Sequence, residues 1–383
     1  MKKPSIVFVI NSIAGGGAER VMMRLVEYSR DRLDAFEFHL VLLDNEDDAY
    51  AIPAWVRVHR LDCDGKSMPS VFRLFSLLRR LRPCLIMSFL TRANIATVLA
   101  AKALGFRSVI SERSNTSAHH EHGVAGLVSR LIIRRTYSRA DAVIAVSTGI
   151  ADDLVDNFGV ERDRMHIIAN PIDAKAIRTL AEEAPAHLPD GPYIVAMGRF
   201  VRGKNFALLL EAFAASRLVD FDLVILGQGP LEQELKALAD DLGLAGRARF
   251  PGFQTNPFPL ISNGFAYVLP SNDEGFPNGL VEAMVTGIPV ISTDCRSGPA
   301  EILDDRAEGQ TTGLHLGKYG LLVPTNDKAA MVEALNHLVL PGERERLGKA
   351  AAEGAARYGL EVAVARYWDV LGSVMAYGGR SAQ

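Results

Sequence analysis

Short runs of β-branched and other apolar residues alternate with helical stretches along nearly all of this 383-residue chain. Such alternation is typical of doubly wound α/β folds, in which a helix follows each strand of a mainly parallel sheet. The predicted strands are 5–10, 37–42, 84–88, 108–111, 142–146 and 166–168 in a first series, and 193–197, 223–226, 248–250, 265–269, 289–292 and 321–323 in a second. The chain is therefore predicted to fold into two Rossmann-like domains of ordinary size.

A polar, Pro-containing segment between residues 170 and 192 separates the two series of strands. We therefore predict an N-terminal domain of residues 1–170 and a second domain of residues 171–359. The remaining residues, 360–383, begin with a helical periodicity and are predicted to form a terminal helix. A cleft between two such domains is the usual place for a small ligand.

Hydropathy and cysteine content point to a cytoplasmic protein. No apolar run approaches the ~20 residues of a membrane span, and the first run stops at Ile10, so the N-terminus is interpreted as a strand and not as a signal peptide. The three cysteines, Cys63, Cys84 and Cys295, are odd in number and lack metal-ligand spacing. This pattern favours a reducing compartment and no zinc site.

The net charge of −3 conceals an uneven distribution of charged residues. Residues 1–170 contain 23 Lys and Arg against 19 Asp and Glu. Between Pro69 and Arg139, twelve basic residues face only Glu112 and Glu121. Such an excess indicates an anionic partner. Nucleic acid is disfavoured, because no aromatic residues are interleaved with the basic ones.

Two carboxylates, Glu274 and Glu282, flank a junction between a polar loop and a helix in the second domain. The intervening loop, 275–279, is rich in Gly, Pro and Asn, so its backbone can turn tightly and present N–H groups at the positive end of the helix. Such a helix end suits a phosphate or a hydroxyl group, and ionised carboxylates accept hydrogen bonds from sugar hydroxyls. The alternative is an acidic cap followed by a solvated glutamate.

Three consecutive glycines, Gly15 to Gly17, follow the first predicted strand and precede a helix that contains Glu19. Glycines let the backbone approach a ligand closely, and the helix end adds a partial positive charge. A phosphate or acceptor contact and a plain tight turn both fit this loop. A dehydrogenase is disfavoured, because the dinucleotide fingerprint is incomplete.

Arg199 and Lys204 bracket a turn after the first strand of the second domain. A diphosphate leaving group needs charge-assisted donors as negative charge builds up on it, and these two side chains supply a planar fork and a point charge. The alternative is a pair of solvated surface bases. Arg202, between them, is interpreted as a surface residue.

These motifs together resemble the signature of the family 4 retaining glycosyltransferases. The resemblance rests on Glu274 and Glu282 with Gly-Phe-Pro-Asn-Gly between them, on the Gly-Gly-Ala-Glu loop at 16–19, and on the Gly-Arg and Lys-Asn pairs within 198–205. It extends over nearly the whole chain and implies the GT-B fold, an α/β fold of two facing Rossmann-like domains whose C-terminal helix crosses back to the N-terminal domain. It also implies that the first domain binds the acceptor and the second a nucleotide sugar.

The resemblance implies roles for individual residues of the second domain. Glu274 would face the transferred sugar, and Glu282 would hold the ribose hydroxyls. Arg199 and Lys204 would hold the diphosphate in place of a cation, so no metal and no cofactor beyond the UDP-sugar is expected. Glu274, Arg199 and Lys204 are thus the predicted catalytic residues. Further implied donor contacts are Gly16, Gly17, Gly227, Phe253, Phe276, Pro277, Asn278 and Gly279. From the sequence alone, a core position is more usual for a residue such as Phe253.

Acceptor contacts are predicted at Glu112 and Arg113, where many relatives have a histidine, and at Glu19. The Ser-Glu-Arg sequence at 111–113 resembles a subgroup that adds N-acetylgalactosamine or galactose to lipid-linked oligosaccharides. Three histidines, His119, His120 and His122, follow with spacing unsuited to a metal and are interpreted as part of a polar loop.

A basic amphipathic helix is predicted between residues 122 and 139. Arg130, Arg134 and Arg135 recur at helical spacing beside apolar residues, and such a helix can rest on an anionic membrane surface. The alternative is an ordinary helix packed on the sheet with its arginines in water. The surrounding excess of basic residues favours membrane contact.

The predicted function is that of a retaining glycosyltransferase moving a hexose or N-acetylhexosamine from a UDP-sugar to a polyprenyl-diphosphate-linked saccharide for cell-surface glycan synthesis. The protein is expected to be cytoplasmic and peripheral on the inner membrane face. A nucleotide-sugar epimerase of the same architecture would isomerise the sugar without an acceptor. A non-catalytic nucleotide-sugar-binding protein would keep Glu282 and Arg199 and show no turnover.

Overall fold

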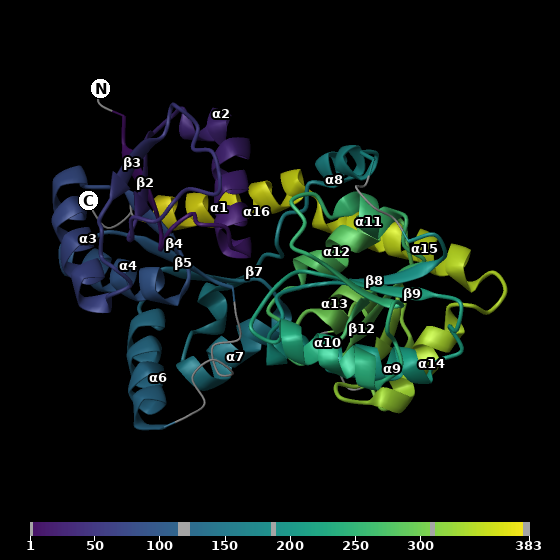
Figure 1. Ribbon diagram of the computed structural model, residues 1–383. Helices are drawn as coiled ribbons and strands as arrows, with labels where there is room; N and C mark the ends of the chain where they lie inside the picture. Colours follow the sequence, from purple (N-terminus) through teal and green to yellow (C-terminus); the bar gives the residue numbers. More distant parts are fainter. Residues whose placement is uncertain (1–2, 114–122, 185–188, 307–310, 378–383) are drawn as a thin grey trace. The chain divides into compact units, whose positions relative to one another are not determined.

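The computed structural model describes residues 3–113, 123–184, 189–306 and 311–377. The chain divides into two compact units (Figure 1). One unit consists of Met1–Pro171 together with Glu361–Gln383, and the other of Ile172–Leu360. Each unit has its own sheet and its own covering helices.

The first unit is built on a sheet of seven described strands, which pair in parallel in the order β3-β2-β1-β4-β5-β6-β7. The strands are β1 (Ser5–Ile10), β2 (Glu37–Leu42), β3 (Arg57–Arg60), β4 (Leu85–Phe89), β5 (Ser108–Glu112), β6 (Ala142–Ala145) and β7 (Met165–Ile167). The central strands β1 and β4 are buried along their whole length. Their continuous apolar sequences are typical of a parallel sheet that is covered on both faces.

Helices cover both faces of the first sheet (Figure 1). One layer contains α3 (Ser67–Leu81), α4 (Thr91–Leu104), α6 (Gly123–Tyr137) and α7 (Thr148–Phe158), each packed on the next. The other layer contains α1 (Gly17–Tyr28), α2 (Arg30–Leu33) and α16 (Leu360–Tyr377). The indole Nε1 of Trp368 in α16 donates a hydrogen bond of 2.7 Å to Oγ of Ser29. The C-terminal helix is therefore part of the first unit.

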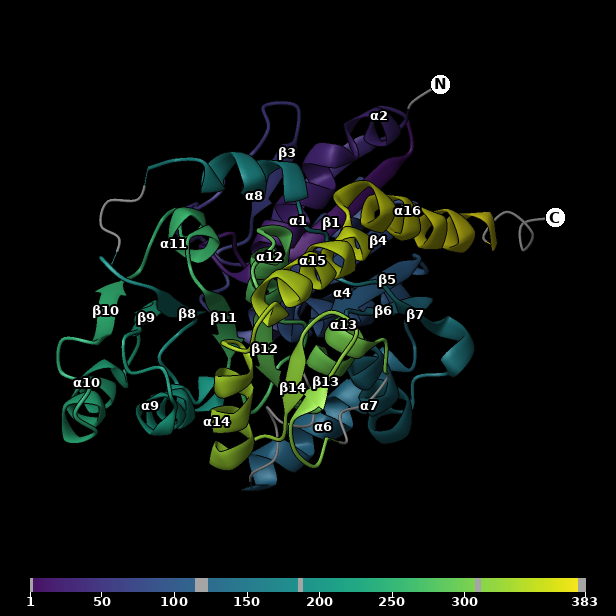
Figure 2. The ribbon, with the colours of Figure 1, turned by 90° about the vertical axis from the view of Figure 1, so that its right-hand side faces the viewer.

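The second unit has a sheet with the order β10-β9-β8-β11-β12-β14-β13 (Figure 2). The strands are β8 (Tyr193–Met197), β9 (Asp222–Leu226), β10 (Ala248–Gly252), β11 (Ala266–Leu269), β12 (Val290–Thr293), β13 (His315–Leu316) and β14 (Leu321–Val323). Among the described strands, β13 pairs antiparallel with β14, and the other pairs are parallel.

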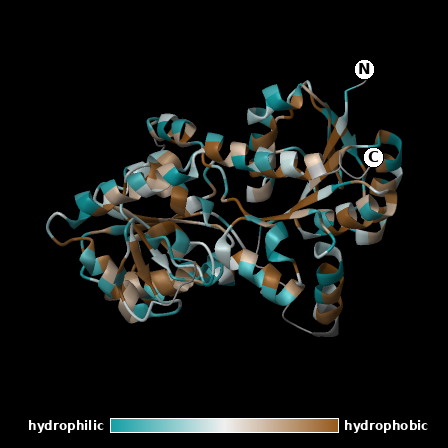
Figure 3. Cartoon of the chain, turned by 180° about the vertical axis from the view of Figure 1, so that it is seen from behind, coloured by the Kyte–Doolittle hydropathy of each residue, from teal (hydrophilic) through white to brown (hydrophobic). Residues whose placement is uncertain are grey.

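Helices again form two layers on the second sheet. One layer contains α9 (Phe206–Ala215), α10 (Glu232–Asp241) and α14 (Lys328–His337). The other contains α8 (Ala174–Ala181), α11 (Phe258–Ser262), α12 (Asn278–Val285), α13 (Pro299–Asp304) and α15 (Glu343–Ala355). Short 3₁₀ turns occur at Arg162–Arg164, Arg202–Lys204 and Ala356–Tyr358. The strands carry the apolar residues of each unit's interior, and the helices are mixed (Figure 3).

The predicted fold class, with two Rossmann-like parallel sheets, is confirmed. Two short strands, β3 and β13, have no counterpart among the predicted ones. β3 lies at a sheet edge, and two of its four residues are exposed arginines, so it lacks the apolar run by which strands are recognised. The predicted loop containing His119, His120 and His122 lies outside the described residues.

Both sheets reverse their strand order at one point, between β1 and β4 in the first unit and between β8 and β11 in the second. The carboxyl ends of the strands at such a reversal form a crevice in which α/β proteins bind ligands. In the first unit, the loop after β1 carries the predicted glycines. In the second unit, the turn after β8 carries Arg199 and Lys204, and the loop after β11 carries Glu274.

Candidate functional site

Glu274 and Lys204 form an ion pair at the carboxyl edge of the second sheet. Nζ of Lys204 lies 2.5 Å from Oε1 of Glu274, whose side chain is 9% exposed. Glu274 belongs to the loop after β11 and Lys204 to the turn after β8, on the two sides of the strand-order reversal. The fold thus brings together two of the three predicted catalytic residues, which are 70 positions apart.

Backbone and amide hydrogen bonds fix the turn containing Arg199 and Lys204 to the loop after β11. The N–H of Asn272 donates to the carbonyl of Gly203 (2.8 Å), and Nδ2 of Asn205 donates to Oδ1 of Asn272 (3.0 Å). Arg199 is exposed, and its guanidinium makes no ion pair with the part of the chain that the structure describes. An exposed guanidinium beside a fixed lysine remains available to an anionic ligand.

Glu282 is buried on α12, with only 2% of its surface exposed. The ring of Tyr267, on β11, is fully buried in the same region, and its hydroxyl donates to the carbonyl of Met197 (3.4 Å). Burial, and then the negative charges of Glu274 and Glu282, raise the pKa of Tyr267 far above its usual value. Tyr267 is therefore a neutral hydrogen-bond donor at physiological pH.

The first turn of α12 has no side-chain cap. Two contacts fix the loop that precedes this turn. Oγ of Ser297 donates to the carbonyl of Glu274 (2.6 Å), and the buried ring of Phe276 packs edge-on against Tyr358. A Cβ at Gly279 would lie only 2.8 Å from the hydroxyl of Tyr267, so glycine is required there. An uncapped, preformed helix N-terminus suits a phosphate or a sugar hydroxyl.

Glycines bring the ends of β8 and β9 into direct contact. Gly227 has a φ of +133°, and a Cβ there would lie 2.0 Å from the carbonyl oxygen of Gly198. Any other residue at 227 would push away the turn that begins with Arg199. Phe253, after β10, is 68% exposed. Its ring is therefore not part of the core, and a core position for this residue is ruled out.

In the first unit, the glycine loop and Glu19 lie against each other at the end of β1. Gly16 is the N-cap of α1, and a Cβ on it would lie 2.1 Å from Oε2 of Glu19. The hydroxyl of Tyr50 donates to the carbonyl of Gly16 (3.2 Å). The Glu19 carboxylate thus covers Gly16, part of the backbone that was predicted to approach a ligand.

Glu112 is fully buried at the end of β5. Its Oε2 accepts hydrogen bonds from the hydroxyls of Tyr137 (2.6 Å) and Thr91 (3.2 Å). Burial and the Glu112 charge raise the pKa of Tyr137 well above its usual value, so Tyr137 acts as the donor. Next to it, Arg113 is half-buried. The Glu112 carboxylate therefore stabilises the end of β5 inside the protein. Of these two predicted acceptor residues, only Arg113 is partly exposed.

Helix α6 presents a mixed apolar and basic face to solvent. Its exposed residues are Leu127, Val128, Leu131, Ile132, Arg134 and Arg135, with Arg139 just beyond its end. The guanidinium of Arg130 is 5.7 Å from the centre of the Phe158 ring in α7. Arg130 is therefore partly covered by α7, whereas Arg134, Arg135 and Arg139 are exposed.

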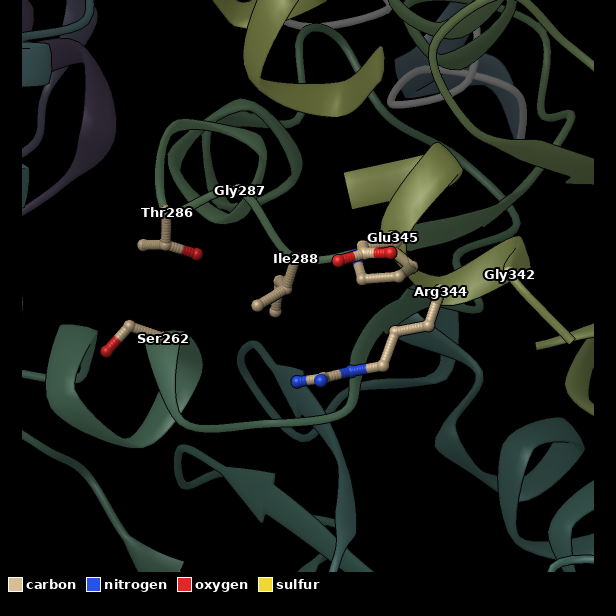
Figure 4. Close-up of a pocket in the computed structure, with 8 residues that line it drawn as sticks. Ser262, Thr286, Gly287, Ile288, Gly342, Arg344 and Glu345 are labelled. Atoms are coloured by element: carbon tan, nitrogen blue, oxygen red, sulfur yellow. The ribbon is translucent and has the colours of Figure 1, made fainter. Parts of the chain in front are cut away.

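A pocket of about 470 Å³ lies in the second unit, between α11, α12 and α15 (Figure 4). Its lining includes Ser262, Thr286, Ile288, Arg344 and Glu345. The pocket adjoins the residues that precede β12, at the amino edge of the sheet. The predicted site residues lie at the carboxyl edge, so this pocket is separate from the candidate site.

Several residues that shape the site were not predicted. The sequence pattern predicts Tyr267 to be an ordinary residue of an apolar strand, and Ser297 and Asn272 to be ordinary loop residues. Their positions depend on contacts between segments far apart in the sequence. The one signal for Tyr267 is a tyrosine within an apolar strand, because the hydroxyl of a buried tyrosine generally needs a hydrogen-bond partner.

Two Rossmann-like units with glycine-rich, charged loops at the carboxyl edges of their sheets define a protein of the GT-B class. The model named "Glycosyltransferase Family 4" matches residues 15–176, and the model named "Glycosyl transferases group 1" matches residues 178–354. A Campylobacter jejuni protein is 31% identical over 370 residues, covering 93% of this chain and 96% of its own length. The chain belongs to the family 4 (group 1) glycosyltransferases and is a transferase.

The Campylobacter protein is named N-acetylgalactosamine-N,N'-diacetylbacillosaminyl-diphospho-undecaprenol 4-alpha-N-acetylgalactosaminyltransferase. A lipopolysaccharide core biosynthesis glycosyltransferase of Rhizobium meliloti, LpsE, is 31% identical over 346 residues, which is 88% of this chain and 90% of that protein. Among solved structures, Anabaena HepE in complex with UDP and glucose matches 97% of this chain and 100% of its own at a TM-score of 0.76 and 18% identity. The lipopolysaccharide galactosyltransferase WaaB matches 96% and 99% at 0.74 and 21%. These two structures share the fold.

Within the described residues, none of the helices combines the length and the apolar character needed to cross a membrane.

Proposed function

We propose that this transferase is a retaining, metal-independent enzyme that moves a hexose or N-acetylhexosamine from a UDP-sugar to a polyprenyl-diphosphate-linked saccharide. The observation that carries the proposal is the convergence of Lys204, Glu274 and Glu282 beside an uncapped helix N-terminus at the strand-order reversal. The names of the Campylobacter relative, which acts on a diphospho-undecaprenol-linked sugar, and of the UDP-bound HepE structure support this choice of substrates.

In the proposed reaction, Arg199 and Lys204 hold the diphosphate of the donor. Negative charge grows on the phosphate oxygen as the bond to the sugar breaks, and the two cations stabilise it without a metal ion. Glu274 faces the sugar, on which positive charge develops. The acceptor hydroxyl attacks the same face and gives its proton to the departing phosphate oxygen. Attack on the face from which the phosphate departs retains the anomeric configuration, and no enzyme nucleophile is required.

Glu282 holds the ribose hydroxyls in the proposed donor complex. We expect Glu282→Gln to weaken UDP binding by about 10- to 100-fold, because hydrogen bonds to a charged group contribute roughly 1.5–3 kcal/mol. The measurement is a calorimetric titration with UDP, GDP and ADP in the presence of EDTA. Glu234→Gln, an exposed glutamate on α10, is the matched control and should bind UDP as the wild type does.

UDP should bind more tightly than GDP or ADP in these titrations. A wild-type protein that prefers GDP or ADP, or that requires a divalent cation for binding, would overturn the donor part of the proposal. Unchanged UDP affinity in Glu282→Gln would remove the role given to the buried carboxylate.

The exposed face of α6 is proposed to rest on the anionic cytoplasmic face of the inner membrane, where the lipid-linked acceptor lies. Arg134, Arg135 and Arg139 each contribute on the order of 1 kcal/mol near such a surface. Replacing all three by glutamine should therefore reduce binding to vesicles containing anionic lipid by about 100-fold, measured by vesicle co-sedimentation. Arg130→Gln, whose side chain packs on Phe158, should have a much smaller effect.

Two controls separate membrane binding from folding. The triple variant should keep the wild-type affinity for UDP, and neither protein should bind vesicles of neutral lipid tightly. Equal binding of the wild type and the triple variant to anionic vesicles would show that α6 is an ordinary solvent-facing helix.

A further inference from the structure

Arg113, immediately after β5, has two N–H groups that lack hydrogen-bond partners. Its Nε and Nη2 atoms are inaccessible to solvent and have no partner among the residues that the structure describes. Nη1, in contrast, donates to the hydroxyl of Tyr367 (2.7 Å) and to Oγ of Ser111 (3.3 Å). Leaving a buried donor unsatisfied generally costs about 1–3 kcal/mol, and more for a charged group. Such a cost is typical of sites where a ligand completes the hydrogen bonds.

Aromatic packing and hydrogen bonds hold the Arg113 side chain in place. The guanidinium carbon lies 4.4 Å from the centre of the Phe89 ring, and Phe89 in turn stacks against Tyr367 of α16 at 6.2 Å. The backbone N–H of Arg113 donates to Oε1 of Glu112 (2.9 Å), whose other oxygen accepts from Tyr137. Elements β4, β5, α6 and α16 thus orient one side chain, which lowers the entropy lost when it binds a ligand.

The unsatisfied atoms identify the chemistry of the missing partner. Nε–H and Nη2–H lie on the same edge of a guanidinium and point in parallel, so this edge forms a two-pronged fork. The fork matches the two oxygens of a phosphoryl or carboxylate group, and such bidentate, charge-assisted pairs are the strongest hydrogen bonds of this kind. A hydroxyl oxygen can also accept hydrogen bonds, but it carries no negative charge to match the guanidinium. The Nε and Nη2 edge of Arg113 therefore favours an oxyanion.

Other unpaired polar atoms lie at the same edge of the first sheet. Oδ1 of Asn11, after β1, and Oγ of Ser147, after β6, are buried and lack partners within the described chain. The carboxyl ends of β1 and β6 lie on the same edge as that of β5. Acceptor and hydroxyl groups of this type suit sugar hydroxyls, whereas Arg113 provides the cationic donor pair.

We propose that Arg113 binds an oxyanion carried by the acceptor through its Nε and Nη2 edge. The acceptor of this transferase then bears a phosphoryl or carboxylate group close to the sugar that is extended. This inference rests on the proposed function, because it assigns the first unit to the acceptor. The oxyanion is either the diphosphate of a short lipid-linked saccharide or the carboxylate of an acidic sugar.

The test is a titration of UDP-saturated protein with two probes, inorganic pyrophosphate and methyl β-D-glucuronide. UDP fills the donor diphosphate site, so remaining oxyanion binding reports a second site. We expect one probe to bind the wild type and to bind Arg113→Gln at least about tenfold more weakly. Arg113→Lys should recover only part of the affinity, since it keeps the charge but loses the fork. Arg79→Gln, an exposed arginine on α3, should behave as the wild type.

Pyrophosphate binding would identify the lipid diphosphate as the anion, and glucuronide binding would identify an acidic sugar. The inference is overturned if neither probe binds, or if Arg113→Gln and the wild type bind equally. Thermal unfolding and UDP affinity show whether a loss of probe binding comes from misfolding or from damage to the donor site. An Arg113→Gln protein with unchanged Tm and UDP affinity is folded and has an intact donor site. Failure of the proposed function would instead appear in the UDP titration, as absence of UDP binding by the wild type.

Discussion

Replacing Glu274 by glutamine should lower kcat by about 100- to 1,000-fold while UDP affinity stays within about twofold of the wild type. Glutamine has nearly the same shape but no charge, so it cannot stabilise the positive charge that develops on the transferred sugar. The carboxylate is well placed for this role, because Lys204 and the Ser297 bond to the loop backbone fix its position. The rate is measured as UDP release under saturating donor and acceptor.

Glu234→Gln serves again as the matched control and should keep full turnover. A Glu274→Gln enzyme with more than half of the wild-type rate would contradict the assignment. Equal loss of UDP affinity in Glu274→Gln and Glu282→Gln would also contradict it, because it would show that the two carboxylates do not have separate roles.

Lys204→Ala should lower kcat by roughly 100-fold or more, since it removes one of the two cations proposed to hold the leaving group. It also removes the partner of the largely buried Glu274. Arg202→Ala, in the same 3₁₀ turn but exposed, is the matched control and should leave kcat and KM unchanged. Similar rates in Lys204→Ala and Arg202→Ala would show that the turn does not act on the diphosphate.

The strands were predictable because buried parallel strands have continuous apolar sequences. β1, β2 and β8 agree with their predicted ranges, as does β14. The boundaries of the other predicted strands differ by one or two residues, as for β4 and β10. Among the described strands, only the short edge strands β3 and β13 were not predicted, because residues at a sheet edge face water and their hydropathy does not distinguish a strand from a loop.

The site was predictable in its motifs and not in its contacts. The resemblance of the motifs to the family signature identified Glu274, Glu282 and Lys204, but no local pattern shows that Lys204 and Glu274 form an ion pair, or that both carboxylates act on the buried Tyr267. Helical periodicity likewise gave α6 a basic character without telling which side packs on α7. In the structure Arg130 packs on Phe158 of α7, whereas Arg134 and Arg135 are exposed.

Glu112, in the first unit, is another residue whose contacts could not be predicted from the sequence. Its place at a strand end indicated an acceptor contact, whereas burial by Tyr137 and α4 turns the carboxylate inward. The adjacent Arg113 keeps two donors unsatisfied. Long-range packing therefore decides which of two neighbouring polar residues has its hydrogen bonds satisfied within the protein.

The most direct test of the proposed function is nucleoside diphosphate release from a panel of UDP-, GDP- and ADP-sugars in EDTA, with and without a short polyprenyl-diphosphate saccharide. We expect release from one UDP-sugar that depends on the lipid acceptor, with product of the same anomeric configuration as the donor. Release that requires a divalent cation, or no release from any UDP-sugar when the acceptor is present, would contradict the account.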